Sequence, residues 1–253
     1  MPEGPSILIT ADTIRPLLKN KKVTAARGNS KIEIDKLVGQ KIIDVKTWGK
    51  HLLLCFSKTN LRIHFLMFGS YSVDQHIKKD QSLRLALTAG KHTVYFYTCA
   101  IRVLEEDPDD IYDWEADTLN PNFNINKAKK KLKELPNEMC CDVILNQDIF
   151  AGAGNIFKNE VLFRIKVHPE TKIKNLPPKK LSDLVKQTHQ YAYDFLEWKK
   201  AYVLRKNWLA HTKRTCPRCE LKFMKKHCGK TKRRTFYCEN CQVFYTKSNP
   251  QTP

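Results

Sequence analysis

The sequence predicts an α+β protein with a β-rich N-terminal part, a helical part and a small cysteine module. Four segments are predicted to be strands: 41–47, 52–56, 83–87, in which leucines alternate with other residues, and 94–103. Apolar side chains instead repeat at helical spacing in three later segments: 139–147, 157–165 and 181–195. Two Cys-x-x-Cys pairs lie near the end of the sequence. This order of elements predicts two domains and an appendage.

The first residues, Met1-Pro2-Glu3-Gly4-Pro5, could take part in a chemical reaction. An initiator methionine followed by a small residue is usually removed inside cells, which would leave the secondary amine of Pro2 at the terminus. Because an α-amino group has a pKa of about 7.7–8.0, part of it is neutral and nucleophilic at physiological pH. Such an amine forms a charged iminium with a sugar carbon, and the Glu3 carboxyl group could transfer protons beside it. The alternative is a Met-Pro start without any chemical role.

A helix is expected to follow directly. Pro5 suits a first turn, and apolar residues recur at helical spacing from Ile7 to Leu18, although Pro16 should end or kink the helix early. Pro2 and Glu3 would then stand at the positive end of the helix, which would lower the pKa of the amine further.

Composition points to a polyanionic partner inside the cell. The formal net charge is +19 over 253 residues, which favours nucleic acid over an anionic membrane. There is no run of about 18 apolar residues and no charged-then-apolar leader, so we expect neither a membrane span nor secretion. Nine cysteines, an odd number, fit metal binding in a reducing compartment better than disulfides.

Two turns of the β-rich part carry conspicuous residues. Lys50 follows Gly49 between two expected strands, where a lysine is usually just solvated. His64 is followed by large apolar side chains around Met67 and then by Gly69. Apolar residues at a strand end are usually core, and a lone histidine is usually structural, so these residue types alone do not decide a role.

A glycine-rich turn precedes the second helical segment. Gly152 and Gly154 stand just before Asn155, where backbone N–H groups at a helix N-terminus can converge on a phosphate. A Gly-x-Gly sequence before a helix is commonly only a tight turn, so this signal is weak without its neighbours.

The cysteine module predicts one structural zinc ion. Cys216 and Cys219 are separated by 18 residues from Cys238 and Cys241, a spacing that closes a tetrahedral four-thiolate site across a β-hairpin. The alternatives are four unmetallated thiols, or a site in which His227 or Cys228 replaces a ligand. Seven cations crowd the intervening hairpin and imply an anionic partner: Lys222, Lys225, Lys226, Lys230, Lys232, Arg233 and Arg234.

Five blocks of this sequence, in order, resemble the formamidopyrimidine-DNA glycosylase and endonuclease VIII family of base-excision repair enzymes. They are Met-Pro-Glu-Gly-Pro, Gly-Lys-His-Leu-Leu-Leu, the Met67 loop, Ala-Gly-Ala-Gly-Asn-Ile-Phe-Lys-Asn-Glu and Arg-Arg-Thr-Phe-Tyr-Cys. Gly4 resembles the Nei-like branch, which favours oxidised pyrimidines. The resemblance implies an N-terminal β-sandwich with flanking helices and a helical helix-two-turns-helix domain with a zinc-finger β-hairpin.

The same resemblance assigns roles to single residues. Pro2 would be the nucleophile, with Glu3 and Lys50 assisting at the sugar and phosphate. Met67 would fill the void left by a flipped base, helped by Leu66 and Phe68, and His64 would contact phosphate. Further phosphate contacts would come from Asn155 and Arg233, while Glu160 would be a buried positioning carboxylate.

Three departures accompany the resemblance, the first two of them from the 8-oxoguanine branch. Residues 98–103, Thr-Cys-Ala-Ile-Arg-Val, stand where that branch carries two more void fillers. The segment from Trp198 to Thr215 leaves no room for a lesion-capping loop. Ser6 replaces a common glutamate, which could alter substrate preference.

The complete prediction divides the chain into residues 1–112, a β-sandwich catalytic domain; 113–127, a hinge; 128–210, the DNA-binding helices; 211–246, the zinc finger; and 247–253, a disordered tail. It describes a monomeric intracellular DNA glycosylase and AP lyase, found wherever the DNA is, that uses zinc and no other cofactor. Its substrate would be damaged duplex DNA, with single strands and bubbles left open. The alternatives are a non-catalytic zinc-dependent nucleic-acid binder and an RNA-binding zinc-ribbon protein.

Overall fold

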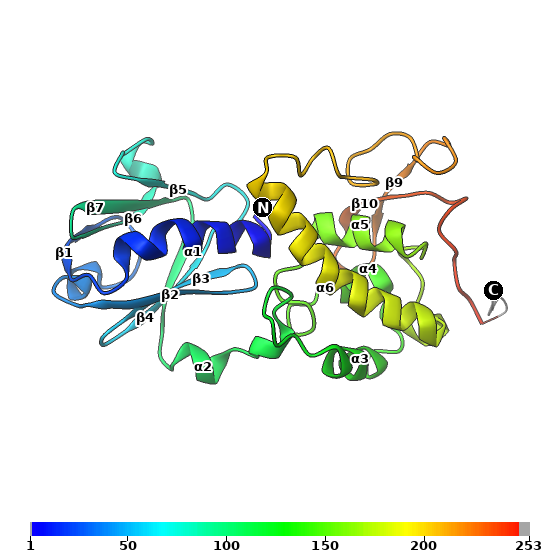
Figure 1. Cartoon of the computed structure of the whole chain (residues 1–253), viewed down its shortest axis with the longest axis horizontal. Coiled ribbons are helices and arrows are strands. Elements are labelled where there is room, and N and C mark those ends of the chain that lie inside the picture. The colour runs from blue at the N-terminus through cyan, green and yellow to red at the C-terminus, as the bar shows by residue number, and fades with distance from the viewer. Residues whose placement is uncertain (1, 248–253) are drawn as a thin grey trace. The chain divides into compact units, whose positions relative to one another are not determined.

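The computed structural model describes residues 2–247 and divides the chain into two compact units, Met1–Asp113 and Trp114–Pro253. Figure 1 shows the helices and strands of the two units, and each unit has its own hydrophobic core. From residue 248 onward, the tail predicted to be disordered lies outside the described residues. The predicted hinge at residues 113–127 stays a prediction.

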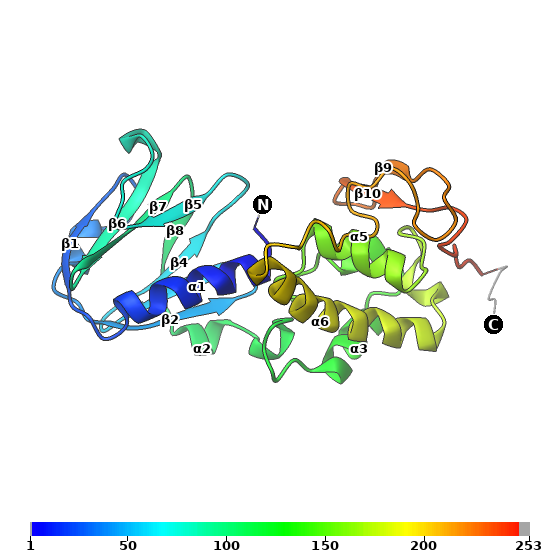
Figure 2. The same ribbon diagram turned by 45° about the horizontal axis from the view of Figure 1, so that its top comes forward.

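Unit 1 is an antiparallel β-sandwich with a helix packed along it, which confirms the predicted fold (Figure 2). One sheet has the strand order β1-β6-β7-β5 and the other has the order β2-β3-β4-β8. The elements are α1 (Gly4–Leu18), β1 (Val23–Arg27), β2 (Ile42–Trp48), β3 (His51–Phe56), β4 (Asn60–His64), β5 (Ser70–Val73), β6 (Leu83–Ala89), β7 (His92–Tyr97), β8 (Ala100–Leu104) and α2 (Pro108–Ile111).

Helix α1 fixes the position of the N-terminus because its apolar face belongs to the sandwich core. Ile7, Ala11, Ile14 and Leu18 are at most 1% exposed and pack with residues of both sheets. The helix runs through Pro16 to Leu18, so the prediction that Pro16 ends it early was wrong, while a kink at Pro16 stays a prediction. The proline lies in the last turn, where its missing N–H costs a single helix bond, and burial of Leu18 retains the turn.

The segment predicted as one strand from 94 to 103 is two strands in different sheets. Thr98 has φ +50° and Cys99 is buried, and together they turn the chain from β7 into β8. The alternation of side chains continues across the turn, so the sequence pattern alone does not reveal the change of sheet.

The acidic run 105–110 contains a short helix, α2, packed on the sandwich. Asp107 caps α2 by accepting a hydrogen bond from the backbone N–H of Asp109, and Pro108 occupies its first turn. Asp109 also forms a 2.9 Å ion pair with Lys46 of β2. A capping aspartate followed by proline therefore begins a helix inside a stretch that charge alone marks as loop.

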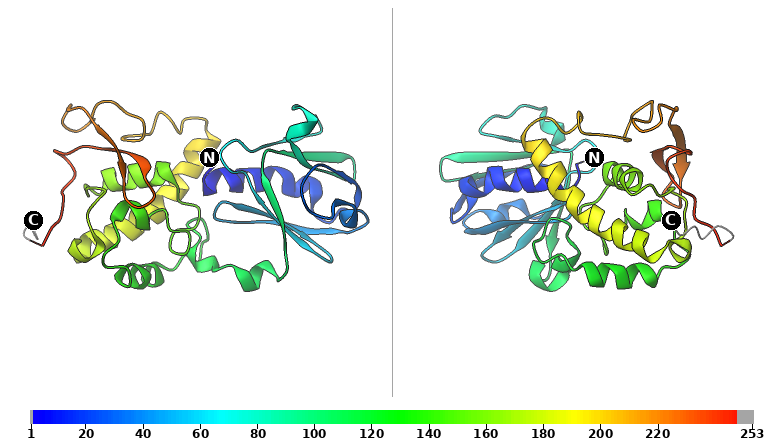
Figure 3. Two further views of the ribbon diagram at one scale, coloured as in Figure 1. Left: turned by 180° about the vertical axis from the view of Figure 1, so that it is seen from behind. Right: turned by 45° about the vertical axis from the view of Figure 1, so that its right-hand side comes forward.

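Unit 2 combines helices with a β-hairpin. Its longer elements are α3 (Ile125–Lys133), α4 (Cys140–Val143), α5 (Asn155–Arg164), α6 (Pro178–Lys200), β9 (Met224–Cys228) and β10 (Arg233–Tyr237). Helices α5 and α6 contact each other, and β10 lies against α5 (Figure 3). The face predicted over 139–147 forms only the four-residue α4 before an irregular turn leads to α5.

Within residues 2–247, no helix combines the length and apolar character that a membrane crossing requires. None of the nine cysteines is in a disulfide.

Candidate functional sites in the two units

One end of the unit 1 sandwich gathers the residues singled out near the N-terminus. Helix α1 begins at the end where β2 turns into β3, and the loop between β4 and β5 lies at the same end (Figures 1 and 2). The pairing of His51 with His64 across β3 and β4 places these two connections side by side. We call this end the N-terminal rim, formed by residues 2–3, 49–51 and 64–69.

Glu3 is built into the start of α1. Its carbonyl oxygen accepts the backbone N–H of Ser6 at 2.8 Å, and the residue is only 3% exposed. Pro2, directly before it, is half-buried. Since α1 begins at Gly4, both residues lie beside the free N–H groups and the positive end of the helix. A developing negative charge or a neutral amine is favoured at this position.

Lys50 occupies a two-residue turn between β2 and β3. Gly49 has φ +53°, which a side chain would resist, so glycine permits the tight connection of Trp48 to His51. Lys50 is 9% exposed, so the alternative of a solvated turn lysine was wrong. Trp48 anchors the turn by donating its indole N–H to the carbonyl oxygen of Asp113 at 2.9 Å.

Two histidines beside Lys50 are held neutral. Burial, followed by the charge of Arg62, lowers the pKa of His51 to about 4. Burial and then the charge of Lys50 lower the pKa of His64. The backbone N–H of Leu66 donates to Nδ1 of His64 at 3.3 Å, which leaves Nε2 as the donor of the neutral ring. The predicted phosphate contact would therefore use Nε2.

The loop after β4 presents apolar side chains to solvent. Met67 is 59% exposed and Phe68 is 76% exposed, so neither belongs to the core. Phe65 beneath them is buried, and its carbonyl oxygen accepts the N–H of Gly69 at 2.7 Å. A Cβ on Gly69 would lie 2.2 Å from that oxygen, so only glycine closes the loop. An exposed apolar tip on an anchored loop suits insertion between bases.

The connection from β7 to β8 is too short to supply further void fillers. Only Thr98 and Cys99 separate the strands, and Cys99 is buried. This agrees with the absence of the void-filling motif from residues 98–103.

In unit 2, three polar side chains of α5 meet the backbone of β10. Asn155 Nδ2 donates to the carbonyl oxygen of Arg234 at 3.0 Å, and Asn159 Oδ1 accepts the N–H of Phe236 at 3.1 Å. Between them, Lys158 Nζ donates to Thr235 Oγ1 at 2.7 Å. Helix α5 thus replaces a neighbouring strand along one edge of the hairpin.

The hairpin exposes most of its cations. Arg233 and Arg234 at the start of β10 are exposed, whereas the next three residues are buried. Two lysines have acidic partners: Lys226 pairs with Glu170 at 3.0 Å, and Lys230 pairs with Glu138. The turn itself is fixed by Asp142, which accepts the N–H of Lys230 at 3.0 Å. A positive surface therefore stands on a rigid support, as a phosphate-binding surface requires.

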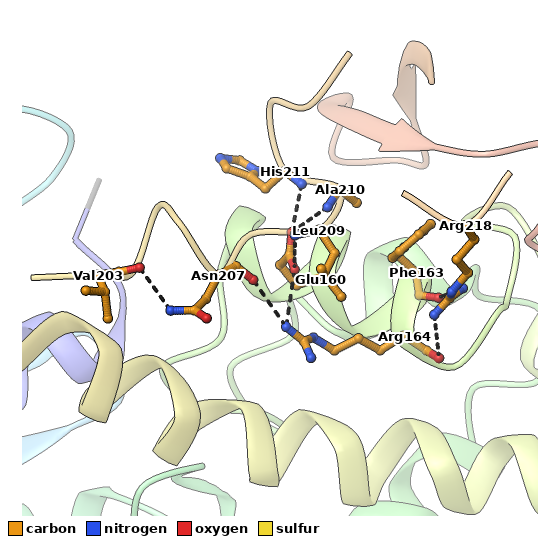
Figure 4. A network of polar contacts seen from close by, with 9 residues as sticks. All are labelled: Glu160, Phe163, Arg164, Val203, Asn207, Leu209, Ala210, His211 and Arg218. Carbon is orange, nitrogen blue, oxygen red and sulfur yellow. Dashed lines mark hydrogen bonds and ion pairs between the residues drawn. The ribbon is translucent and has the colours of Figure 1, made fainter. Parts of the chain in front are cut away.

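Glu160 is a buried positioning residue. It is 0% exposed, and its carboxylate accepts the backbone N–H groups of Leu209, Ala210 and His211 at 2.8–3.0 Å (Figure 4). Arg164 lies 3.6 Å from the same carboxylate. The contacts fasten α5 to the segment that leads into the first cysteine pair.

The four predicted cysteine ligands converge. The sulfur atoms of Cys216, Cys219, Cys238 and Cys241 all lie within 4.8 Å of one another. Two of the separations are 3.4 and 3.8 Å, close to the ~3.8 Å between thiolates around one tetrahedral zinc ion with Zn–S bonds of about 2.3 Å. Cys228 is instead buried in the helical core, and His227 bonds Lys232, so neither joins the cluster.

Sequence reasoning missed two residues that hold this unit together. Lys158 lies inside the motif at residues 151–160, but the sequence pattern assigns it no role of its own. Arg218, between the first two cysteines, donates from Nη1 to the carbonyl oxygen of Phe163 at 2.8 Å and stacks on that ring at 4.0 Å (Figure 4). A cation inside a Cys-x-x-Cys pair could have signalled such a link, because a helix C-terminus attracts positive charge.

The structure thus brings Pro2, Glu3, Lys50, His64 and Met67 to one end of unit 1. Asn155 and Arg233 belong to unit 2, on the adjoining ends of α5 and β10.

Two families of known domains match the chain. The formamidopyrimidine-DNA glycosylase N-terminal domain matches residues 1–100, and the formamidopyrimidine-DNA glycosylase H2TH domain matches residues 115–203. Endonuclease 8-like 3 of Xenopus laevis is 30% identical over 90% of this chain and 38% of its own length. Formamidopyrimidine-DNA glycosylase of Lactobacillus helveticus is 27% identical over 97% of this chain and 100% of its own.

Solved structures share the same fold. A viral DNA glycosylase superimposes with a TM-score of 0.80 at 22% identity, covering 95% of this chain and 100% of that one. The Lactococcus lactis formamidopyrimidine-DNA glycosylase, non-covalently bound to DNA containing an AP site, gives a TM-score of 0.81 at 18% identity over 95% and 99% of the two chains.

The fold is therefore that of a DNA glycosylase built from a β-sandwich, an H2TH domain and a four-cysteine hairpin. The chain belongs to the formamidopyrimidine-DNA glycosylase and endonuclease VIII family, with Nei-like proteins among its relatives. It spans between a third and two fifths of the endonuclease 8-like 3 proteins that it matches, 38% and 35% of two of them.

Proposed function

We propose that the chain removes oxidised bases, pyrimidines in particular, from damaged DNA and then cuts the abasic strand. The observation that carries this proposal is the N-terminal rim. A buried carboxyl residue and a buried lysine stand with the start of α1 at the end of the sandwich that also presents an exposed apolar loop. This arrangement would place four functions at one end of the unit: a nucleophile, a proton-transferring carboxyl group, a cation that attracts phosphate, and an apolar side chain that fills the space of the flipped base.

The nucleophile is the secondary amine that Pro2 acquires once Met1 is removed. Its nitrogen bonds to C1′ of the damaged nucleotide while the bond from C1′ to the base breaks, and the base leaves with a proton. The bond from C1′ to the ring oxygen O4′ then breaks and O4′ takes a proton. The iminium that forms acidifies the C2′ proton, whose loss expels the 3′ phosphate. A second elimination expels the 5′ phosphate, and water releases the enzyme by hydrolysing the iminium.

Glu3 and Lys50 assist these steps from the protein side. Glu3 donates a proton as the sugar ring opens and accepts protons during the eliminations. Lys50, buried at the turn next to two neutral histidines, is the local cation available to a phosphate at the sugar. A phosphate contact there would offset part of the cost of burying a lysine.

The base must leave the stack before the amine can reach C1′. Met67, with Leu66 and Phe68 beside it, would enter the vacated space and offset part of the unstacking cost of a few kcal/mol. His64 would add a phosphate contact through Nε2. Because the β7–β8 connection is short, the strand opposite the lesion has few partners from this unit, and single-stranded or bubble DNA becomes a candidate substrate beside duplex.

Unit 2 would hold the DNA backbone. Asn155 at the start of α5 and Arg233 at the start of β10 would bind phosphates that flank the lesion. One zinc ion in the four-thiolate cluster would stabilise the hairpin that carries Arg233, because the donor set and sulfur spacing suit zinc.

Borohydride trapping tests the chemistry directly. The protein is incubated with an oligonucleotide containing an abasic site, and sodium borohydride reduces any iminium to a stable amine. We expect a covalent protein–DNA complex for the processed wild type, attached at Pro2 by peptide mass mapping. The Pro2→Gly variant should trap far less, whereas Pro5→Ala, with the same loss of a proline ring one turn later, should still trap.

The outcomes separate the hypotheses. A protein that binds abasic DNA in a gel shift but never cross-links would be the zinc-dependent binder, and a preference for RNA would indicate the RNA-binding alternative. Retention of Met1 or acetylation of the terminus in a preparation that still cleaves would refute the Pro2 mechanism. A panel of thymine glycol, hydantoin and 8-oxoguanine oligonucleotides then measures the lesion preference.

A further inference from the structure

Helix α5 carries a lysine that solvent does not reach. Lys158 is 0% exposed, and besides its 2.7 Å bond to Thr235 Oγ1 its Nζ atom donates to the carbonyl oxygens of Arg233 and Arg234 at 3.3 Å each. The three donors of one ammonium group are therefore all used on three consecutive residues of β10. In the described part of the chain, Lys158 forms no ion pair.

These contacts fix the backbone at the two exposed arginines. Two successive carbonyl groups of a regular strand point to opposite sides, yet here both accept from the same nitrogen atom. Asn155, one turn earlier on α5, also donates to the carbonyl oxygen of Arg234 at 3.0 Å. Carbonyl groups at the start of β10 thus converge on the ammonium group, while Arg233 and Arg234 are themselves exposed to solvent.

The surroundings of Lys158 make its charge costly. Burial lowers its pKa to about 8, and the groups that influence its charge are Cys141 and Asp142 on α4, Cys228 on β9 and Arg233 on β10. Burial raises the pKa of both thiols, and burial together with the Lys158 charge lowers the pKa of His211 to about 4. The carboxylate of Asp142 is engaged by the hairpin turn. A methionine would fill the same space without this cost.

We propose that Lys158 is a positioning residue for DNA binding: its buried ammonium group holds the backbone of Arg233 and Arg234 so that the guanidinium group of Arg233 faces a DNA phosphate. The proposal rests on the function proposed above, in which Arg233 binds phosphate. Lys158 itself touches no DNA, because it has no exposed surface. Its effect on affinity must therefore act through Arg233.

A double-mutant cycle tests this coupling. The dissociation constant for a duplex containing a tetrahydrofuran abasic analogue is measured for the wild type, Lys158→Met, Arg233→Ala and the double variant. We expect each single variant to bind about tenfold more weakly, the scale of one lost charged contact. The double variant should be barely weaker than Arg233→Ala, since Lys158 has nothing left to position. Independent, multiplying effects would overturn the proposal.

The salt dependence adds a readout that a purely structural lysine would not move. In Lys158→Met, the slope of log affinity against log salt should fall by about one, as if a phosphate contact were lost. The matched control is Lys130→Met on α3, which removes the same charge from an exposed position and should leave the slope unchanged. Equal slopes for wild type and Lys158→Met would contradict the positioning role.

A pH series keeps the proposal testable even if Lys158→Met does not fold. Circular dichroism and zinc content establish folding first. Between pH 7 and 9.5 the wild type should lose affinity with a midpoint near the Lys158 pKa of about 8, and Arg233→Ala should show little of this loss. An affinity loss of the same size in Arg233→Ala would refute the coupling.

The two proposals fail in different ways. If Arg233→Ala binds as tightly as the wild type, the phosphate-binding role of Arg233 is wrong and the Lys158 proposal fails with it. If Arg233→Ala binds weakly while Lys158→Met binds normally, only the Lys158 proposal fails.

Discussion

A carboxylate oxygen of Glu160 accepts the backbone N–H of Ala210 at 2.8 Å, although the two residues are 50 positions apart in the sequence. Because Leu209 and His211 donate to the same carboxylate, three successive backbone N–H groups surround one buried anion. These N–H groups donate to the carboxylate the hydrogen bonds that water would otherwise donate. The segment before the first cysteine pair is thereby held on α5, the helix that also holds β10.

Replacing this anion should destabilise unit 2. Glu160→Gln keeps the size of the side chain but removes the charge and places an NH₂ group where an acceptor is needed. We expect the free energy of unfolding to fall by about 2–4 kcal/mol. Urea denaturation followed by circular dichroism measures the loss. Glu134→Gln, an exposed change at the end of α3, is the matched control and should cost less than about 0.5 kcal/mol.

Removal of the metal should loosen the hairpin and weaken DNA binding. We expect one zinc ion per chain by elemental analysis, because the four sulfur atoms form a single cluster. A strong chelator should lower the affinity for abasic-site DNA by at least tenfold, since β9 and β10 carry the cationic surface. Cys219→Ser should mimic the chelator, whereas Cys228→Ser should keep the zinc. A chelated protein with unchanged affinity would contradict a structural role for zinc.

Acid should destabilise the protein through its buried histidines. The pKa of His51 is about 4 when folded, below its ordinary 6.5, because burial disfavours the charged ring. The folded state thus binds fewer protons than the unfolded chain, so this contribution is complete above pH 6.5 and is lost as the pH falls to 4. Unfolding measured between pH 7.5 and 4 should show a flatter pH dependence in His51→Gln. The exposed His227→Gln is the control and should follow the wild type.

A tyrosine stands where a glycine would be more stable. Tyr202, just after α6, has φ +60° and is 95% exposed, so no packing compensates for the left-handed backbone. Tyr202→Gly should raise the free energy of unfolding by about 0.5–1 kcal/mol, since the relieved strain exceeds the added freedom of the unfolded chain. Thermal unfolding checks this. Tyr202→Ala keeps a Cβ and should gain nothing, so equal gains in both variants would rule out backbone strain as the cause.

Local patterns predicted the elements that local physics controls. The helical spacing over 181–195 predicted α6, and the two strands around Gly49 formed where they were predicted. Gly49 permits the turn between these strands because its φ is positive. Local patterns failed where contacts with residues distant in the sequence determine the structure. Pro16 stays helical because Leu18 is buried in the sandwich, and the chain changes sheets at residues 98–99 because Cys99 joins the core.

By itself, the sequence predicted the four cysteines that converge, the two-part α+β organisation and the family resemblance, because each follows from residue spacing and local side-chain patterns. Only the tertiary structure decided that Lys50 is buried and that the loop tip around Met67 is exposed. It also decided that the charged groups of Lys158 and Glu160 form hydrogen bonds with backbone atoms of other segments. Those contacts join residues about 50 to 80 positions apart, where no periodicity or spacing relates the partners. Their energies depend on burial, which exists only once unit 2 has folded.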